Sequence, residues 1–182
     1  DLWIGGLEGG LQMIAKSGKT QKTFDDINWI HSIEVISSDQ IAVATVNGFC
    51  IINKKTGKVQ RYATSKDFNE QNASAYIISM LFNNDGTVWL EGGGLSLYNM
   101  HTRELKTFTT SEGMLSNDVY SLQRDSKGCI WASTGKGLAI VKDFKVLNLN
   151  YIYDIDKVYN KSACIRLSDG RFAYGSTSGA VF

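Results

Sequence analysis

The stretch that decides the fold runs from residue 125 to residue 140 and reads DSKGCIWASTGKGLAI. A turn signal, Asp125 to Gly128, precedes an apolar segment around Trp131, and a second glycine turn precedes another apolar segment. Versions of this stretch recur along the whole chain. Their anchor residues lie 39 to 47 positions apart: Trp3, Ala42, Trp89, Trp131 and Ala173. A small residue stands ten positions before each of the last four anchors: Ser32, Ser79, Ser121 and Ala163. The chain is therefore a repeat.

Each repeat predicts four short strands. In the clearest copy the first strand covers Val119 to Gln123, the second carries Trp131, the third starts at Gly137, and a fourth follows. No helical period extends beyond a turn or two. Four-stranded units of about 40 to 45 residues are typical of propeller blades. The sequence predicts an all-β fold, a β-propeller segment of four-stranded antiparallel blades, with three complete and two partial blades.

The repeat register predicts where each blade begins and ends. The expected blades are 1–24 (partial), 25–62, 63–108, 109–148 and 149–182 (partial). The chain starts in a second strand and stops inside a third strand, which would leave unpaired sheet edges. We therefore expect an excerpt of a larger protein, whose further blades pack against this part. As an alternative, the two partial blades could pair with each other and close a small ring.

Composition and charge exclude several classes of protein. The 182 residues are 43% apolar and 20% charged, which is ordinary for a folded globular chain, whereas the 18 glycines and the absence of proline stand out. A net charge of +1 gives no electrostatic reason to expect nucleic acid as a partner. No apolar run approaches the length of a membrane helix. The three cysteines, which have no paired spacing and no histidine nearby, are interpreted as small buried residues: Cys50, Cys129 and Cys164. We expect no cofactor and no metal site.

Several repeated residues permit a functional reading beside a structural one. Tryptophans 3, 89 and 131 could stack on sugars, but their recurrence at one place in each blade favours packing between blades. The aspartates of the Asp-Gly turns are expected to cap hairpins. The glycine clusters lack the following helix that a phosphate site needs, so turn geometry is the better interpretation.

The segment from Gly113 through Leu122, continued to Leu138, resembles the two-component regulator propeller repeat. Leu2 to Gly6 is similar to the second strand of the same repeat, whereas the blades after Asp25 and after Tyr151 have lost the tryptophan. The resemblance implies the periplasmic sensor region of a bacterial hybrid two-component system, with a membrane anchor and a histidine kinase elsewhere in the parent protein. It also implies oligosaccharides as ligands and a homodimeric parent. None of those other modules lies in this sequence.

Propeller topology predicts where a ligand would bind. One face is built from the segments that lead into each first strand and from the loops that join second to third strands. The residues expected on this face as a ligand site are Asn28, Trp29, Tyr76, Asn117, Asp118 and Lys136. Trp29, Tyr76 and Asp118 occupy equivalent positions with differing chemistry, as a site added to a repeat would show. Aromatic rings with Asn and Asp nearby suit a sugar.

The sequence predicts binding and shape change without catalysis, because no nucleophile, base and orienting group stand together. The alternative is a propeller-type polysaccharide hydrolase or lyase, for which Glu8 or Asp118 with His31 is the candidate set. A pure protein-interaction scaffold is a third possibility.

Overall fold

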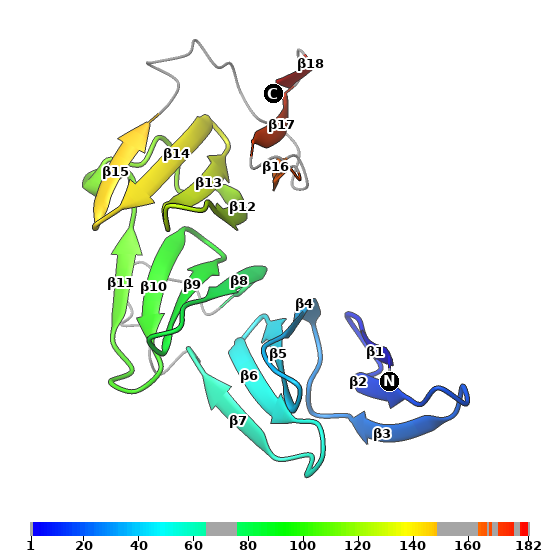
Figure 1. Ribbon diagram of the computed structural model, residues 1–182. Helices are drawn as coiled ribbons and strands as arrows, with labels where there is room; N and C mark the ends of the chain where they lie inside the picture. Colours follow the sequence, from blue (N-terminus) through cyan, green and yellow to red (C-terminus); the bar gives the residue numbers. More distant parts are fainter. Residues whose placement is uncertain are drawn as a thin grey trace.

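The computed structural model describes residues 2–64, 76–148, 164–166, 168, 171–176 and 179–181. These residues form five antiparallel sheets and no α-helix (Figure 1). Three of the sheets have four strands and two have three. The predicted all-β propeller segment, with three complete and two partial blades, is confirmed.

Strands follow one another in chain order within every sheet. The first sheet contains β1 (Leu2–Gly5), β2 (Leu11–Ile14) and β3 (Thr20–Phe24). The second contains β4 (Ile30–Val35), β5 (Gln40–Thr45), β6 (Gly48–Asn53) and β7 (Val59–Tyr62). The third contains β8 (Ser79–Phe82), β9 (Thr87–Glu91), β10 (Leu95–Asn99) and β11 (Leu105–Phe108). The fourth contains β12 (Val119–Arg124), β13 (Ile130–Thr134), β14 (Gly137–Lys142) and β15 (Lys145–Asn148). The fifth contains β16 (Cys164–Arg166), β17 (Phe172–Ser176) and β18 (Gly179–Val181).

The Asp-Gly turns are held by the carboxylates that the sequence singles out. Asp125 accepts hydrogen bonds from the backbone N–H groups of Lys127 (2.9 Å) and Cys129 (2.8 Å), and from the indole N–H of Trp131 (3.0 Å). Burial raises the pKa of Asp125, but these hydrogen bonds outweigh it and leave the pKa below its ordinary value. The prediction that the aspartates cap hairpins is confirmed for Asp125 and for Asp85, which accepts from the backbone N–H of Thr87 (2.9 Å), whereas Asp169 lies outside the described residues.

Gly48 shows why glycine marks the turn between a second and a third strand. Its φ of 83° lies in the left-handed region, and a Cβ there would overlap the carbonyl oxygens of Tyr62 and Ala63. Only glycine therefore lets the outermost strand of this blade approach the hairpin.

The sheets stand side by side along an arc, with their first strands on the inner side (Figure 1). Successive first strands contact each other: β4 with β8, β8 with β12, and β12 with β16. The fourth strands β7, β11 and β15 lie on the outer side. Within the described residues β1–β3 and β16–β18 belong to separate sheets, so the two partial blades do not close a small ring.

The hydrophobic core lies between neighbouring sheets rather than inside one of them. Separate apolar clusters fill the junctions of sheets one and two, two and three, and three and four. Trp89 is buried at 7% exposure in the third junction, where it packs against Phe108 with ring centroids 5.4 Å apart. Trp3 and Trp131 are only partly buried. The prediction that the tryptophans are core residues is thus confirmed for Trp89, whereas Trp3 and Trp131 lie only partly in the core.

The cysteines Cys50 and Cys129 are buried and carry free thiols, as expected for small apolar residues. Burial raises the pKa of Cys50 to about 11. The side chain of Cys164 lies outside the described residues. No helix in the described part of the chain has the length and apolar character to cross a membrane.

Candidate functional site

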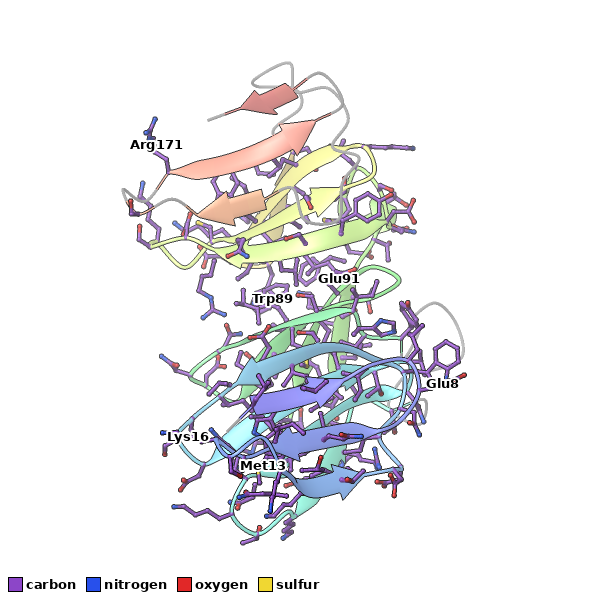
Figure 2. The ribbon with its side chains drawn as sticks, turned by 90° about the vertical axis from the view of Figure 1, so that its right-hand side faces the viewer. Glu8, Met13, Lys16, Trp89, Glu91 and Arg171 are labelled. Carbon is purple, nitrogen blue, oxygen red and sulfur yellow. The ribbon has the colours of Figure 1, made fainter. Side chains whose placement is uncertain are left out.

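The loops of the propeller divide between two opposite faces. Figure 2 shows Glu8, in the loop between β1 and β2, on the right, and Lys16 and Arg171, in turns on the other face, on the left. We call the side that carries Glu8 the leading face, because the segments that lead into the first strands lie there. Backbone hydrogen bonds join these segments to the preceding blade: Trp29 N–H donates to Leu7 (3.1 Å) and Ile77 N–H to Thr45 (2.9 Å).

Trp29 is the most unusual residue of the leading face. Its φ is 55°, a left-handed conformation that bulky residues seldom adopt, and its side chain is 50% exposed. A strained backbone and an exposed indole both cost free energy, so the combination favours a role outside folding. Leu7, 55% exposed, lies beside it through the backbone hydrogen bond.

The side chain of Asn28, next to Trp29 in the chain, is hydrogen-bonded within the protein. Its side-chain oxygen accepts from the backbone N–H of Gly10 (3.0 Å), and its side-chain NH₂ donates to the carbonyl of Asp25 (2.7 Å). The amide therefore holds the segment that presents Trp29, and both of its ends are already engaged.

Tyr76 stands in the column of Trp29, one blade further on, and packs against His31. The two ring centroids are 4.6 Å apart with an interplanar angle of 54°. Tyr76 is 36% exposed, whereas His31, on the innermost strand β4, is partly buried. The sequence pointed to His31 only in the enzyme alternative, and the structure places it beside Tyr76 in the candidate site. The signal was available, because residues near the starts of adjacent first strands must lie side by side in a propeller.

Asn117, Asp118 and Lys136 form a second group, on the fourth sheet. All three are exposed. Asn117 Oδ1 accepts from the backbone N–H of Thr110 (2.9 Å), and the backbone carbonyl of Asp118 accepts from Gly135 N–H (2.9 Å). These bonds tie the leading segment to the short 3₁₀ turn η1 (Thr110–Glu112) and to the loop that carries Lys136.

Tyr120 is a member of this second group that sequence reasoning missed. A Cβ placed on Gly135 would lie 3.3 Å from the Tyr120 hydroxyl and 3.5 Å from the Asp118 Cβ. The missing side chain of Gly135 thus leaves room beside a carboxylate and a phenol. Trp29, His31 and Tyr76 belong to the second and third sheets and this group to the fourth, so the candidate residues form two groups on different blades of the leading face.

Glu91 is the other residue that the sequence did not reveal. Strand register places it opposite Ser79, just as Ala44 lies opposite Ser32 and Ser133 opposite Ser121. In this column of small residues Glu91 is fully buried, at the end of β9 beyond Trp89 (Figure 2). A glutamate in a column of alanine and serine was a readable signal, because buried carboxylates are rare.

Cavities occur on the face opposite the leading face. One, of about 520 Å³, lies between the first and second sheets and is lined by Trp3, Met13, Lys22 and Lys54, among others. Another, of about 480 Å³, lies between the second and third sheets. Within the described residues no group of three His, Cys, Asp or Glu side chains is arranged to hold a metal ion.

The repeat can be compared with known families once this geometry is clear. Residues 113–136, which follow η1 and contain β12 and β13, match the model of the two component regulator propeller family. The matched segment is 24 of the chain's 182 residues. The match includes Asn117, Asp118 and Lys136, so half of the candidate ligand residues lie within the repeat. No protein among the curated sequences matches this chain.

Solved structures share the arrangement of the blades. The extracellular domain of the hybrid two component system BT4673 from B. thetaiotaomicron is 23% identical, with a TM-score of 0.73 over 98% of this chain and 25% of that chain. The extracellular domain of BT3049 from the same organism is 22% identical, with a TM-score of 0.68 and the same coverage. Virginiamycin B lyase from Staphylococcus aureus is 16% identical, with a TM-score of 0.57 over 81% of this chain and 48% of that chain. This chain spans a quarter of the length of the two extracellular domains, and these likenesses show a common fold.

Proposed function

We propose that the chain is part of the extracellular sensor region of a two-component signalling receptor. The observation that carries this proposal is the two component regulator propeller repeat at residues 113–136. The shared fold over 98% of the chain with the extracellular domains of two hybrid two component systems supports it. The sensor would lie in the periplasm, in a receptor anchored in the inner membrane, and would signal to a histidine kinase on the other side.

Further blades of the parent propeller pack against the first sheet in this proposal. Leu2 and Ile4 flank Trp3 on β1 and are 59% and 51% exposed. Their equivalents on β9, Val88 and Leu90, are buried against the second sheet at 0% and 1% exposure. An apolar surface of the same register supports a preceding blade that covers it, because burying the exposed halves of these two side chains contributes about 1.5 to 3 kcal/mol.

The ligand of the leading face is an oligosaccharide in this proposal. The exposed rings of Trp29 and Tyr76 offer apolar faces to the C–H groups of a sugar, and Asp118 and Lys136 offer hydrogen bonds on the fourth sheet. Because the strained backbone of Trp29 holds its indole outward, the site needs little rearrangement before binding. Binding would shift the equilibrium between two arrangements of a homodimeric parent and so change kinase activity.

Calorimetry with a panel of oligosaccharides tests this function on the protein and its variants. We expect saturable heat with at least one glycan, and at least a tenfold loss of affinity in Trp29→Ala and in Tyr76→Ala. Phe144→Ala is the matched control, because Phe144 is also an exposed aromatic residue with positive φ, at 58% exposure, in a turn of the opposite face. Equal affinities in the unmodified protein and the three variants would contradict a glycan site on the leading face.

A lyase or hydrolase is the second candidate function. The fold likeness to virginiamycin B lyase favours it, together with Glu8 or Asp118 and His31 as acid and base. The ring of His31, however, packs against Tyr76, so His31 can form part of a binding surface without acting in catalysis. Cleavage of any glycan by the protein, lost in His31→Ala, would favour the enzyme over the sensor.

A further inference from the structure

The cavity between the second and third sheets lies on the face opposite the leading face. Its volume of about 480 Å³ falls within the range of small-molecule sites, which is about 300 to 1,000 Å³. Both sheets that form it have four strands, so its walls belong to two complete blades. The lining residues come from β4, β5, β6 and β8 and from nearby turns.

The cavity sits where the repeat has lost an indole. On the second sheet Glu34, Ala42 and Ile51 lie opposite one another on adjacent strands. The same register on the third sheet contains Leu81, Trp89 and Leu97, and there the Trp89 side chain fills the junction with the fourth sheet. Ala42 provides only a methyl group. Ala42 itself is fully buried, and its register neighbours Glu34 and Ile51 line the cavity, so the open space lies next to the position of the absent indole.

The walls of the cavity are apolar and adaptable. They consist of Ile36, Ile51, Met80, Phe82 and Met100. Methionine side chains fit rings of varied shape and make favourable contacts between sulfur and aromatic rings. Walls of this kind favour a flat aromatic ring over a polar sugar.

The rim of the cavity carries hydrogen-bond acceptors. Glu34, Gln40 and Asn84 are exposed there, and the side chains of Gln40 and Asn84 make no hydrogen bond within the part of the chain that the structure describes. The nearby guanidinium of Arg124 donates to the carbonyl of Phe82 (3.2 Å) and to Asn83 Oδ1. With the cation engaged and the Glu34 carboxylate exposed, the rim is complementary to a ligand that donates a hydrogen bond.

We propose that this cavity is a second binding site, which takes a small aromatic molecule with an N–H or O–H donor on its ring. The ring lies beside the position of the absent indole, between Ile51 and the two methionines, and the donor reaches Glu34 or Gln40. This site does not depend on the proposed function of the leading face.

Methyl NMR of the protein with ¹³C-labelled methionine tests the proposal, with indole as the probe. The chain has four methionines. Met80 and Met100 line this cavity, Met13 lines the cavity between the first and second sheets, and Met114 is buried in the third junction. We expect saturable shifts of Met80 and Met100 with indole and no shift of the other two. Shifts of all four methyls alike, or of none, would overturn the proposal.

Two kinds of variant sharpen the experiment. Ala42→Trp restores the indole of the repeat, and we expect it to abolish the response of Met80 and Met100 to added indole; an unchanged response would contradict the site. Glu34→Gln and Gln40→Ala alter exposed rim residues and are expected to fold whether or not Ala42→Trp does. Gln40→Ala should weaken the binding of indole about fivefold, which is the effect of one hydrogen bond. It should leave the binding of toluene, which has no donor, unchanged. Equal affinity of both rim variants and the unmodified protein for indole would refute the role of the rim.

Discussion

Replacing Asp125 should destabilise the protein by an amount that its three hydrogen bonds determine. The carboxylate accepts from two backbone N–H groups, at 2.8 and 2.9 Å, and from the indole of Trp131 at 3.0 Å. Each bond contributes about 0.5 to 1.5 kcal/mol, and the turn is partly exposed, so Asp125→Ala should lower the free energy of unfolding by about 2 to 3 kcal/mol. Asp125→Asn keeps one carbonyl oxygen for the backbone donors and turns an NH₂ toward the indole, so it should cost about 1 kcal/mol.

Urea denaturation at pH 7 and at pH 2.5 measures both effects. Because the pKa of Asp125 is lowered in the folded protein, its contribution is present above the unfolded-state value of about 3.9 and is lost as the pH falls through the folded value. The difference between Asp125→Ala and the unmodified protein should therefore shrink at pH 2.5. A double-mutant cycle with Trp131→Phe isolates the indole bond, with an expected coupling of about 1 kcal/mol. Zero coupling, or a difference that does not change with pH, would refute the reasoning.

Three further predictions concern other parts of the fold. Gly48→Ala should lower the free energy of unfolding, measured by urea denaturation, by at least about 1 kcal/mol more than Gly18→Ala does. Both glycines have a φ above 80°, but of the two only Gly48 has backbone atoms where a Cβ would lie. Trp89→Ala should cost about 3 to 5 kcal/mol, measured in the same way, whereas Trp131→Ala, with a partly exposed side chain, should cost less. With a pKa near 11, Cys50 should resist iodoacetamide at pH 8 until the protein unfolds, as site-resolved mass spectrometry would show; rapid labelling of the folded protein would contradict its burial.

The fold could be predicted in detail because a repeat reports the same information several times. The column of Trp3, Ala42, Trp89 and Trp131 and the Asp-Gly turns fix the position of every blade, and each turn residue acts locally. What the repeat could not convey was the degree of burial. A tryptophan packs against the next blade, so its exposure depends on that neighbour's side chains, and within the described residues Trp89 packs into the apolar surface of the fourth sheet.

The candidate site was harder to predict because it depends on departures from the repeat. Trp29 and Tyr76 stood out as variable residues in equivalent positions, whereas the contact of Tyr76 with His31 joins two blades and follows only when adjacent first strands are placed side by side. The engaged amide of Asn28 also depends on a contact with Gly10, eighteen residues away. Glu91 and Ala42 break the pattern of their columns, so comparing columns residue by residue would have identified both.

Calorimetry followed by chromatography distinguishes binding of an oligosaccharide without turnover from its cleavage. The protein is titrated with oligosaccharides in a calorimeter, and the contents of the cell are then separated by chromatography. The account predicts saturable heat with at least one glycan, recovery of that glycan intact, and loss of the heat in Trp29→Ala. Glycan fragments in the cell, or heat that Trp29→Ala leaves unchanged, would contradict it.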